Sequence, residues 1–213
     1  MGENSPKNSE SEDRWAHEKE LWAAGTRLVA GIDEAGRGPL AGPVVASAVV
    51  LPQSFNRTEV RDSKLLTARK RRELALHIRD EAVCWSVVSV GEREIERINI
   101  LQATLRAMRQ AVERLSSRPG WLLVDAVTVP GLEIPQRAII KGDRLSVSIA
   151  AASILAKVER DRIMEEYHLR YPRYGFAGHK GYGTVKHREA IRLYGPCEAH
   201  RRTFRGVKEH CQG

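Results

Sequence analysis

The chain is poor in cysteine, and its three cysteines, Cys84, Cys197 and Cys211, are spread widely along the sequence. Because their number is odd and no C-x-x-C pair occurs, the sequence indicates neither a disulfide framework nor a zinc site. Unpaired cysteines of this kind suit a reducing compartment. We therefore expect the protein to be cytoplasmic.

Long uninterrupted apolar runs are also missing. No stretch is apolar over enough residues to span a bilayer, and the N-terminus lacks the apolar core of a signal peptide. The chain begins with Met1-Gly2, as myristoylated proteins do, but Pro6 stands where that signal requires Ser or Thr. These absences predict a protein without a membrane partner.

The chain of 213 residues is long enough for one domain with a sizeable core and too short to require two. Residues 1–13 are polar and show no periodicity, which predicts a disordered tail. We expect one domain over residues 14–207, helical in its C-terminal region, and a short polar tail over 208–213. Lys and Arg outnumber Asp and Glu by 35 to 27, which suits a polyanionic partner such as nucleic acid.

Hydrophobic periodicity predicts strands that alternate with helices. The expected strands span 27–32, 44–51, 85–90, 121–124 and 137–141. The expected helices span 15–24, 67–81, 99–115, 146–168 and 185–194. The apolar stripe of the third helix consists of Leu101, Leu105, Met108, Val112 and Leu115. Thr184 is the expected N-cap of the last helix, and Gly195-Pro196 its end.

The expected pairing of the strands gives the fold class. A short glycine-rich loop joins the first two strands, so we expect them to run antiparallel. The strand at 121–124 is expected to lie beside the first, and the Ala-rich start of the helix at 146–168 should approach the sheet closely. Together these features predict an α/β domain with a mixed sheet.

The most informative segment is residues 29–43, which reads VAGIDEAGRGPLAGP. Asp33 and Glu34 end an apolar strand, where strands commonly present ligand-binding residues. The glycines at 36 and 38 permit close backbone approach, so the N–H groups around Arg37 are candidates to meet a sugar or phosphate oxygen. Carboxylates beside such a loop suggest a cation that bridges protein and phosphate.

Two other interpretations of this segment remain open from the residues alone. A plain exit from the strand is one, because Gly-rich turns after strands are common. A dinucleotide-binding loop is the other, but here the glycines run G-x-G-x-x-x-G and Pro39 lies in the turn. The two acids in front would also repel a bare pyrophosphate, which disfavours that interpretation.

Two further carboxylates occur later in the chain. Asp125 ends the apolar run 121–124, which would bring it towards Asp33, although a capping or turn aspartate fits the same pattern. Asp143 precedes the Ala-rich helix, where helix entry is the simplest role. Because hard cations need oxygen ligands, these carboxylates are the candidates for a metal site.

An ordered set of motifs extends from about residue 15 to 207 and is similar to bacterial ribonuclease HII. The motifs are residues 31–43, Asp62-Ser63-Lys64, Val124-Asp125, Lys141-Gly142-Asp143, 151–158, Gly181-Tyr182-Gly183-Thr184 and 200–204. So long an ordered set is far more specific than any single motif. The resemblance implies the ribonuclease H-like fold, with a mixed sheet flanked by helices and a helical C-terminal region.

The resemblance also implies the activity. It predicts a metal-dependent endoribonuclease that hydrolyses the RNA strand of RNA–DNA hybrids and incises 5′ to ribonucleotides embedded in duplex DNA, giving 3′-hydroxyl and 5′-phosphate ends. Two Mg²⁺ or Mn²⁺ ions about 3.5–4 Å apart would support this chemistry. The family is generally monomeric, and a contact with a replication clamp is left open. The implied catalytic and metal-binding residues are Asp33, Glu34, Asp125 and Asp143.

Substrate-reading residues are implied in the same way. The backbone of Gly36-Arg37-Gly38 would contact the ribose 2′-hydroxyl, which separates RNA from DNA. Tyr182 would pack on the neighbouring deoxyribose, with a buried core tyrosine as the alternative, and Lys64 would contact a phosphate. This chain departs from the family at Ala126, where Gly is usual, and at Leu65, where a second lysine is frequent.

Several polar residues have no unique assignment. The basic run 69–72 fits either a duplex contact or a solvated helix face. His200 is weak evidence for zinc or for a general base, because no second ligand has suitable spacing. Ser153 has the pattern of a hydrogen-bonded helix serine rather than a nucleophile. Three arginines are candidates to extend a duplex-binding surface: Arg201, Arg202 and Arg205.

Two other function classes compete with this prediction. A noncatalytic hybrid-binding protein would keep the fold and the basic surface, but the presence of all four carboxylates argues against it. A resolvase-like or transposase-like nuclease would use similar carboxylates on DNA alone. Such enzymes need no reader of the 2′-hydroxyl, so Gly36-Arg37-Gly38 and Tyr182 argue against them.

Overall fold

The computed structural model describes residues 13–57, 59–60 and 66–211. A five-stranded sheet in the order β3-β2-β1-β4-β5 forms its centre. β1 pairs antiparallel with β2 and parallel with β4, so the sheet is mixed, as the sequence predicts. The strands are β1 (Val29–Ala35), β2 (Val44–Val50), β3 (Cys84–Val90), β4 (Trp121–Asp125) and β5 (Gln136–Ile139).

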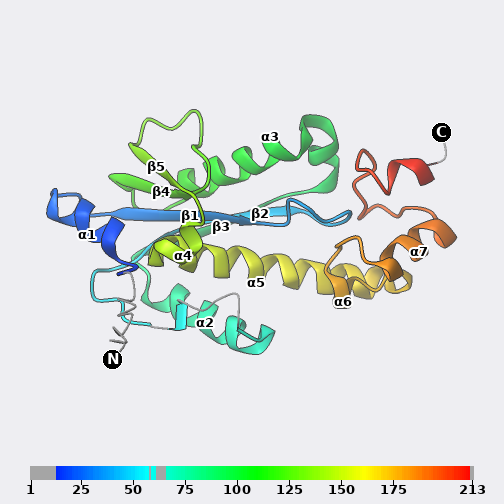
Figure 1. The fold of residues 1–213 in the computed structure, drawn as a ribbon, viewed down its shortest axis with the longest axis horizontal. Helices are drawn as coiled ribbons and strands as arrows, with labels where there is room; N and C mark the ends of the chain where they lie inside the picture. Colours follow the sequence, from blue (N-terminus) through cyan, green and yellow to red (C-terminus); the bar gives the residue numbers. More distant parts are fainter. Residues whose placement is uncertain (1–12, 58, 61–65, 212–213) are drawn as a thin grey trace, which may run out of the picture.

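Helices cover both faces of the sheet. Figure 1 shows α3 along one face, α5 along the other, and α2 outside α5; α6 and α7 lie at the far end of α5 with the C-terminal segment. The helices are α1 (Ala16–Ala23), α2 (Ala68–Glu81), α3 (Glu92–Glu113), α4 (Gly142–Leu145), α5 (Val147–Arg170), α6 (Phe176–His179) and α7 (Val185–Tyr194). Short 3-10 turns occupy Pro172–Tyr174 and Lys208–His210.

Alternate residues of β1 face opposite layers. Ala30 and Ile32 belong to the core cluster that includes residues of α3, such as Met108. Gly31 faces α5, and a Cβ built there would lie 2.0 Å from the backbone carbonyl carbon of Ser148. Only glycine therefore allows this approach, which confirms the predicted close packing of the small-residue half of α5 on the sheet.

The first helix fixes the start of α5. Glu18 is completely buried, and its Oε1 accepts a hydrogen bond from the Ser146 hydroxyl at 2.6 Å and from the Ser148 N–H at 2.9 Å. A carboxylate at a helix N-terminus also interacts favourably with the helix dipole. The short helix α1 thus anchors α5, a role that the sequence pattern did not indicate.

One predicted helix boundary is wrong. The helix expected from Asn99 begins at Glu92, because about two further turns, with Gly91 as N-cap, precede a kink. At the kink Asn99 has φ 66°, and its side chain accepts a hydrogen bond from Gln102 N–H at 3.1 Å. Asn99 therefore starts only the second segment of α3. Asn99 thus acts as a cap inside a longer element.

The predicted apolar stripe of α3 is also partly wrong. Leu101 is 45% exposed, and the buried face is made mainly of small residues. The buried apolar residues of the long segment are Ala103, Ala107, Met108, Ala111 and Val112. Alanines let α3 lie close to the sheet, so leucine periodicity was a poor guide to its inward face.

Other predictions at the ends of the chain have mixed outcomes. Thr184 caps α7 by accepting from His187 N–H, and Gly195 follows the helix, as predicted. The disordered tail predicted for 1–13 lies outside the described residues except for Asp13, and Lys64 lies outside them too. No helix among the described residues is long and apolar enough to cross a membrane.

Gly31→Ala tests the contact between α5 and β1. The added methyl would overlap the backbone of α5, so we expect a loss of about 1–3 kcal/mol or more, and a fall in Tm of about 2–4 °C per kcal/mol. Thermal unfolding monitored by circular dichroism measures it. Gly91→Ala is the matched control, because no atom lies within 4 Å of a Cβ there. Equal stability of the two variants would contradict the proposed packing.

Candidate active site

Two carboxylates meet at the carboxyl end of the parallel strand pair. β1 and β4 are in register from Val29 opposite Trp121 to Ile32 opposite Val124, so Asp33 and Asp125 come next on adjacent strands. Neighbouring strands lie about 4.8 Å apart. Asp33 is 5% exposed and Asp125 is half-buried. The structure therefore brings these two predicted residues together.

Burial and mutual repulsion disfavour ionisation of this cluster. Burial raises the pKa of Asp33 well above its usual value, and the charges of Glu34 and Asp125 raise it further. Burial also raises the pKa of Glu34; the Arg37 guanidinium opposes that shift, and Asp125 adds to it. Arg37 lies 3.4 Å from Glu34, and this ion pair is partly exposed. The site thus concentrates negative charge that the protein only partly compensates.

Local donors hold the carboxylates in place. Asp33 accepts a hydrogen bond from Glu34 N–H at 2.7 Å and a second from the Ser153 side chain of α5. Asp125 accepts a hydrogen bond from Gly142 N–H at 2.7 Å. Ser153 is therefore a hydrogen-bonded helix serine, as predicted, but its partner belongs to the predicted site. The sequence offered no signal for that partner.

Asp143 directly follows Gly142, whose N–H donates to Asp125. It is 5% exposed and belongs to the one-turn helix α4. The backbone carbonyl of Asp143 accepts a hydrogen bond from Arg14. Its backbone position fits the predicted entry to a helix. A role as a fourth metal-site carboxylate stays a prediction.

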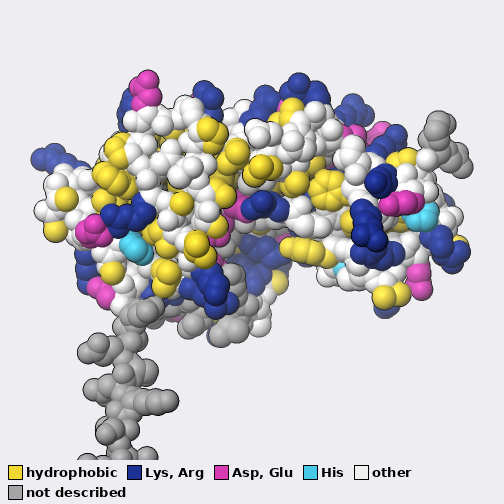
Figure 2. Space-filling model, turned by 45° about the horizontal axis from the view of Figure 1, so that its top comes forward, with side chains coloured by type: hydrophobic (Ala, Val, Ile, Leu, Met, Phe, Trp, Pro, Cys, Tyr) yellow, Lys and Arg dark blue, Asp and Glu magenta, His cyan; other side chains and the backbone are white. Residues whose placement is uncertain are grey.

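A pocket of about 360 Å³ opens beside the carboxylates. Its lining joins β1, the glycine-rich loop, α2, α5 and the loop after α6. The lining residues are Glu34, Ala35, Gly36, Arg71, Ser153, Ile154, Lys157, Arg160 and Tyr182. Of the basic run 69–72, Arg71 reaches this pocket, whereas Arg69 pairs with Glu73 on the helix surface at 2.9 Å. Figure 2 shows Lys and Arg side chains spread over one face of the molecule, without a single dominant patch.

The glycine-rich loop, residues 36–43, rests on two buried arginines. Arg160 of α5 and Arg201 each donate three hydrogen bonds to backbone carbonyls, all but one of them within the loop. Arg201 is therefore not part of a duplex-binding surface: it is completely buried, and that prediction was wrong. A run of basic residues in a sequence does not separate a buried arginine from exposed ones.

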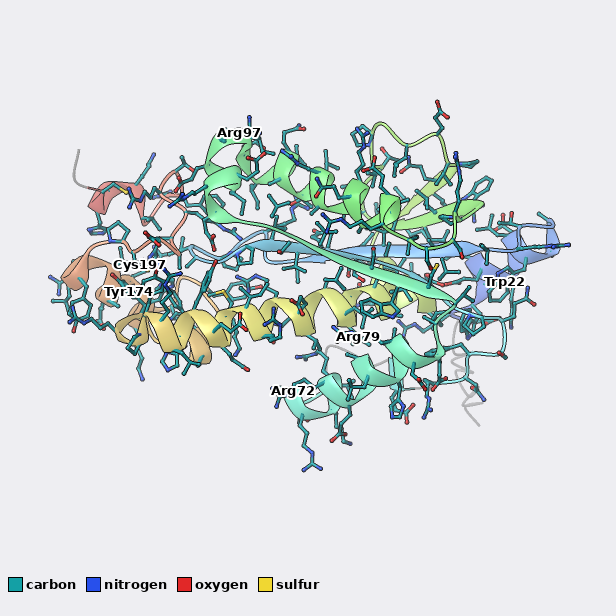
Figure 3. All side chains as sticks on the ribbon, turned by 180° about the vertical axis from the view of Figure 1, so that it is seen from behind. Trp22, Arg72, Arg79, Arg97, Tyr174 and Cys197 are labelled. Carbon is teal, nitrogen blue, oxygen red and sulfur yellow. The ribbon has the colours of Figure 1, made fainter. Side chains whose placement is uncertain are left out.

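Tyr182 is accessible. Its side chain is 49% exposed at the pocket, which excludes the alternative of a buried core tyrosine. Figure 3 shows Tyr174 and Cys197 beside one another at the end of α5 that carries this region. The backbone of Tyr182 is held by buried histidines at that end of the helix.

A directed chain of hydrogen bonds reaches the Tyr182 backbone. Cys197 N–H donates to His200 Nδ1 at 3.0 Å, so His200 carries its hydrogen on Nε2. That hydrogen faces His187 Nε2 at 3.1 Å, which leaves the His187 Nδ1–H to donate to the Tyr182 carbonyl at 2.9 Å. His200 is thus a structural histidine with a histidine partner, and the sequence did not indicate the pair.

The chain is similar to known proteins over most of its length. The family model for Ribonuclease HII matches residues 30–207. A Ribonuclease HII of Syntrophotalea carbinolica is 53% identical over 193 residues, which are 91% of this chain and 92% of that protein.

The chain belongs to the ribonuclease HII family.

Two solved structures share the architecture of this ribonuclease HII. Ribonuclease H2 of Pyrococcus horikoshii OT3 has a TM-score of 0.73 and 29% identity, covering 85% of this chain and 96% of that one. The ribonuclease HIII named Bst-RNase HIII, solved in complex with Mn²⁺, has a TM-score of 0.69 and 18% identity, covering 97% and 75%. The predicted ribonuclease H-like fold and the enzyme class, an endoribonuclease of the ribonuclease H type, are confirmed.

The departure from the family at Ala126 falls at an unusual backbone conformation. Ala126 adopts φ 58°, in the left-handed region where glycine is preferred. Its N–H donates to Ile139 O at 3.0 Å, so the turn after Asp125 is kept despite the side chain. The turn therefore has a conformation that suits glycine.

Asp33→Asn tests the repulsion within the carboxylate cluster. Because the pKa of Asp33 is raised by folding, its ionised form destabilises the folded state at neutral pH. In chelator we expect Asp33→Asn to raise Tm by about 2–4 °C per kcal/mol of relieved burial cost and repulsion, and the gain to shrink as acid protonates Asp33. The exposed Asp80→Asn is the control. A lower Tm for Asp33→Asn at neutral pH would contradict this account.

The buried histidine pair predicts a pH dependence. Burial lowers the pKa of His187 and of His200 to about 4. Unfolded histidines bind protons near about pH 6.5, so the free energy of unfolding should fall as pH drops from there towards 4. NMR titration of the imidazole resonances, with urea unfolding in parallel, measures both effects. Midpoints of about 6.5 for both histidines would contradict this prediction, because the folded protein would then bind their protons as readily as the unfolded chain does.

Proposed function

We propose that this chain hydrolyses the phosphodiester bond on the 5′ side of a ribonucleotide, in RNA–DNA hybrids and in duplex DNA, and leaves 3′-hydroxyl and 5′-phosphate ends. One observation carries the proposal: the charged cluster of Asp33, Glu34 and Asp125 lies at the entrance to the glycine-rich loop. Reaction chemistry and ribose recognition thereby share one pocket.

The donor set at the cluster suits a hard divalent cation. Carboxylate oxygens are the ligands that Mg²⁺ and Mn²⁺ prefer. A cation would offset the burial and the repulsion that together raise the pKa of Asp33. Among the described residues no group of three acidic, histidine or cysteine side chains is placed so that it could hold a metal ion with the side chains as they stand. Asp33 and Asp125 instead accept hydrogen bonds from nearby backbone N–H groups.

We assign the metal ions to Asp33, Glu34, Asp125 and Asp143. When bound, Mg²⁺ or Mn²⁺ supplies an activated water, charge neutralisation at the phosphate and stabilisation of the leaving oxygen. The chain itself orients the ligands: the Ser153 side chain bonds Asp33, and Gly142 N–H fixes Asp125. Burial of Asp33 between β1 and α5 limits the number of orientations it can adopt.

The substrate reader is the backbone of Gly36-Arg37-Gly38 together with Tyr182. Arg37 and Gly38 are exposed, and no Arg37 or Gly38 N–H donates to a protein group in the described part of the chain. Such amides are available to a 2′-hydroxyl, which both donates and accepts hydrogen bonds. The exposed ring of Tyr182 offers a flat apolar surface to the neighbouring sugar.

The remaining assignments follow from the same chemistry. We place the protein in the cytoplasm, where its free cysteines stay reduced. The proposed partners are the RNA–DNA hybrid and ribonucleotide-containing duplex DNA, bound by a monomer. Lys64 keeps its proposed phosphate contact, although it lies outside the described residues.

Cleavage of a labelled DNA duplex with one embedded ribonucleotide tests the proposal. We expect incision 5′ to the ribonucleotide with Mg²⁺ or Mn²⁺, none with chelator, and none on the matching all-DNA duplex. Asp125→Asn should reduce the rate by at least about 10³-fold while duplex affinity stays, since the change removes a charge with little change of volume. The exposed Asp80→Asn is the control.

Two results would contradict this function. Cutting of the all-DNA duplex would indicate a nuclease of the same fold that does not read the 2′-hydroxyl. Duplex binding without incision, under every metal condition, would indicate a noncatalytic hybrid-binding protein.

A further inference from the structure

Two guanidinium groups support the glycine-rich loop from inside the protein. Arg201 donates to the carbonyls of Gly36 at 2.5 Å, Arg37 at 2.9 Å and Gly42 at 2.9 Å. Arg201 is 0% exposed, so neither its charge nor its donors contact solvent. Three backbone carbonyls on one planar fork fix the loop at both of its ends.

The geometry of the peptide bond means that these hydrogen bonds also fix the direction of the loop's N–H groups. In a trans peptide the C=O and the following N–H point in opposite directions, and the described chain contains no cis peptide. Because the Gly36 and Arg37 carbonyls point at Arg201, the N–H groups of Arg37 and Gly38 point away from it. Arg201 therefore aims these two amides outwards.

The outer side of the loop is open and the inner side is filled. A Cβ built on Gly38 would meet no atom within 4 Å. A Cβ built on Gly36 would lie 2.1 Å from Arg160 Nε, so the glycine at 36 is required by the arginine behind it. The two exposed amides thus face the space where a ligand can approach.

Arg160 connects the loop to the tyrosine segment. Its guanidinium donates to the carbonyls of Ala41 at 3.1 Å, Pro43 at 3.1 Å and Lys180 at 3.0 Å. Lys180 lies two residues before Tyr182, and Leu40 N–H also donates to Gly181 O at 2.9 Å. One side chain of α5 thereby sets the spacing between the two proposed readers of the sugar.

A buried carboxylate compensates part of this charge. Glu92 at the start of α3 is 8% exposed, and the charges of Arg201 and Arg160 oppose the rise in its pKa that burial causes. Tyr167 donates to Glu92 at 3.3 Å. Two buried cations near one carboxylate form a network whose removal would leave polar groups unpaired.

We propose that Arg160 and Arg201 are positioning residues that preorganise the Arg37 and Gly38 amides, and their spacing from Tyr182, for recognition of a ribose 2′-hydroxyl. This inference rests on the proposed function, because it assigns no new substrate. The proposal explains why the loop is supported by guanidinium groups, which have several N–H donors in one plane, and not simply by positive charge. A lysine keeps the charge but cannot hold three carbonyls in one plane.

Arg201→Lys tests the proposal, with the exposed Arg192→Lys as matched control. Two labelled duplexes that differ by a single 2′-hydroxyl serve as probes, and affinity for each is measured in chelator. Cleavage of the ribonucleotide duplex is measured with Mg²⁺, and folding by thermal unfolding. We expect Arg201→Lys to lose about tenfold in kcat/KM on the ribonucleotide duplex and most of its preference for that duplex, with affinity for all-DNA changed less than about threefold.

The outcomes distinguish a failure of the proposed function from a failure of the role proposed for the two arginines. A wild-type protein that does not cleave the ribonucleotide duplex with Mg²⁺ would overturn the proposed function and this inference with it. Cleavage by a wild-type protein that shows no preference in affinity would overturn the inference alone. A wild-type preference that Arg201→Lys retains would overturn the inference alone, as would an equal loss of affinity for both duplexes. If Arg201→Lys does not fold, Arg160→Lys carries the same test, and failure of both to fold would assign the arginines to folding rather than to recognition.

Discussion

The close packing of α5 against β1 and the loop that follows it positions most of the site. Where β1 begins, the missing side chain of Gly31 lets the α5 backbone approach. Further along the helix, Ser153 meets Asp33 at the end of the strand, and Arg160 fills the space behind Gly36. The helix thus sets the spacing of the site, because Ser148, Ser153 and Arg160, each about one to two turns from the next, contact successive parts of β1 and its loop.

Charge is distributed in opposite ways on the two sides of the loop. In front, Asp33 and Glu34 repel one another in partial burial, which suits a site that binds cations and polyanions together. Behind, Arg160 and Arg201 are buried cations satisfied by backbone carbonyls. The carboxylates at the proposed metal site thus repel one another, whereas the arginines behind the loop are paired with backbone carbonyls.

The sequence predicted the elements that depend on local pattern and missed those that depend on burial. Apolar strands, the Thr184 cap and the placing of Asp33 beside Asp125 followed from periodicity and strand ends. The kink at Asn99 could not be separated from a helix start, because the capping signal is the same. Arg201 stood in a basic run, and nothing local marks a guanidinium that will be buried against carbonyls.

The central claim is that the outward amides of the loop read the 2′-hydroxyl beside the carboxylate cluster. A crystal structure of the Asp125→Asn variant with a DNA duplex carrying one ribonucleotide tests it directly. We expect the 2′-oxygen to lie about 2.7–3.2 Å from the Arg37 or Gly38 nitrogen, and the phosphate on the 5′ side of that ribonucleotide to lie next to Asp33. A bound duplex whose 2′-oxygen contacts neither amide would contradict it.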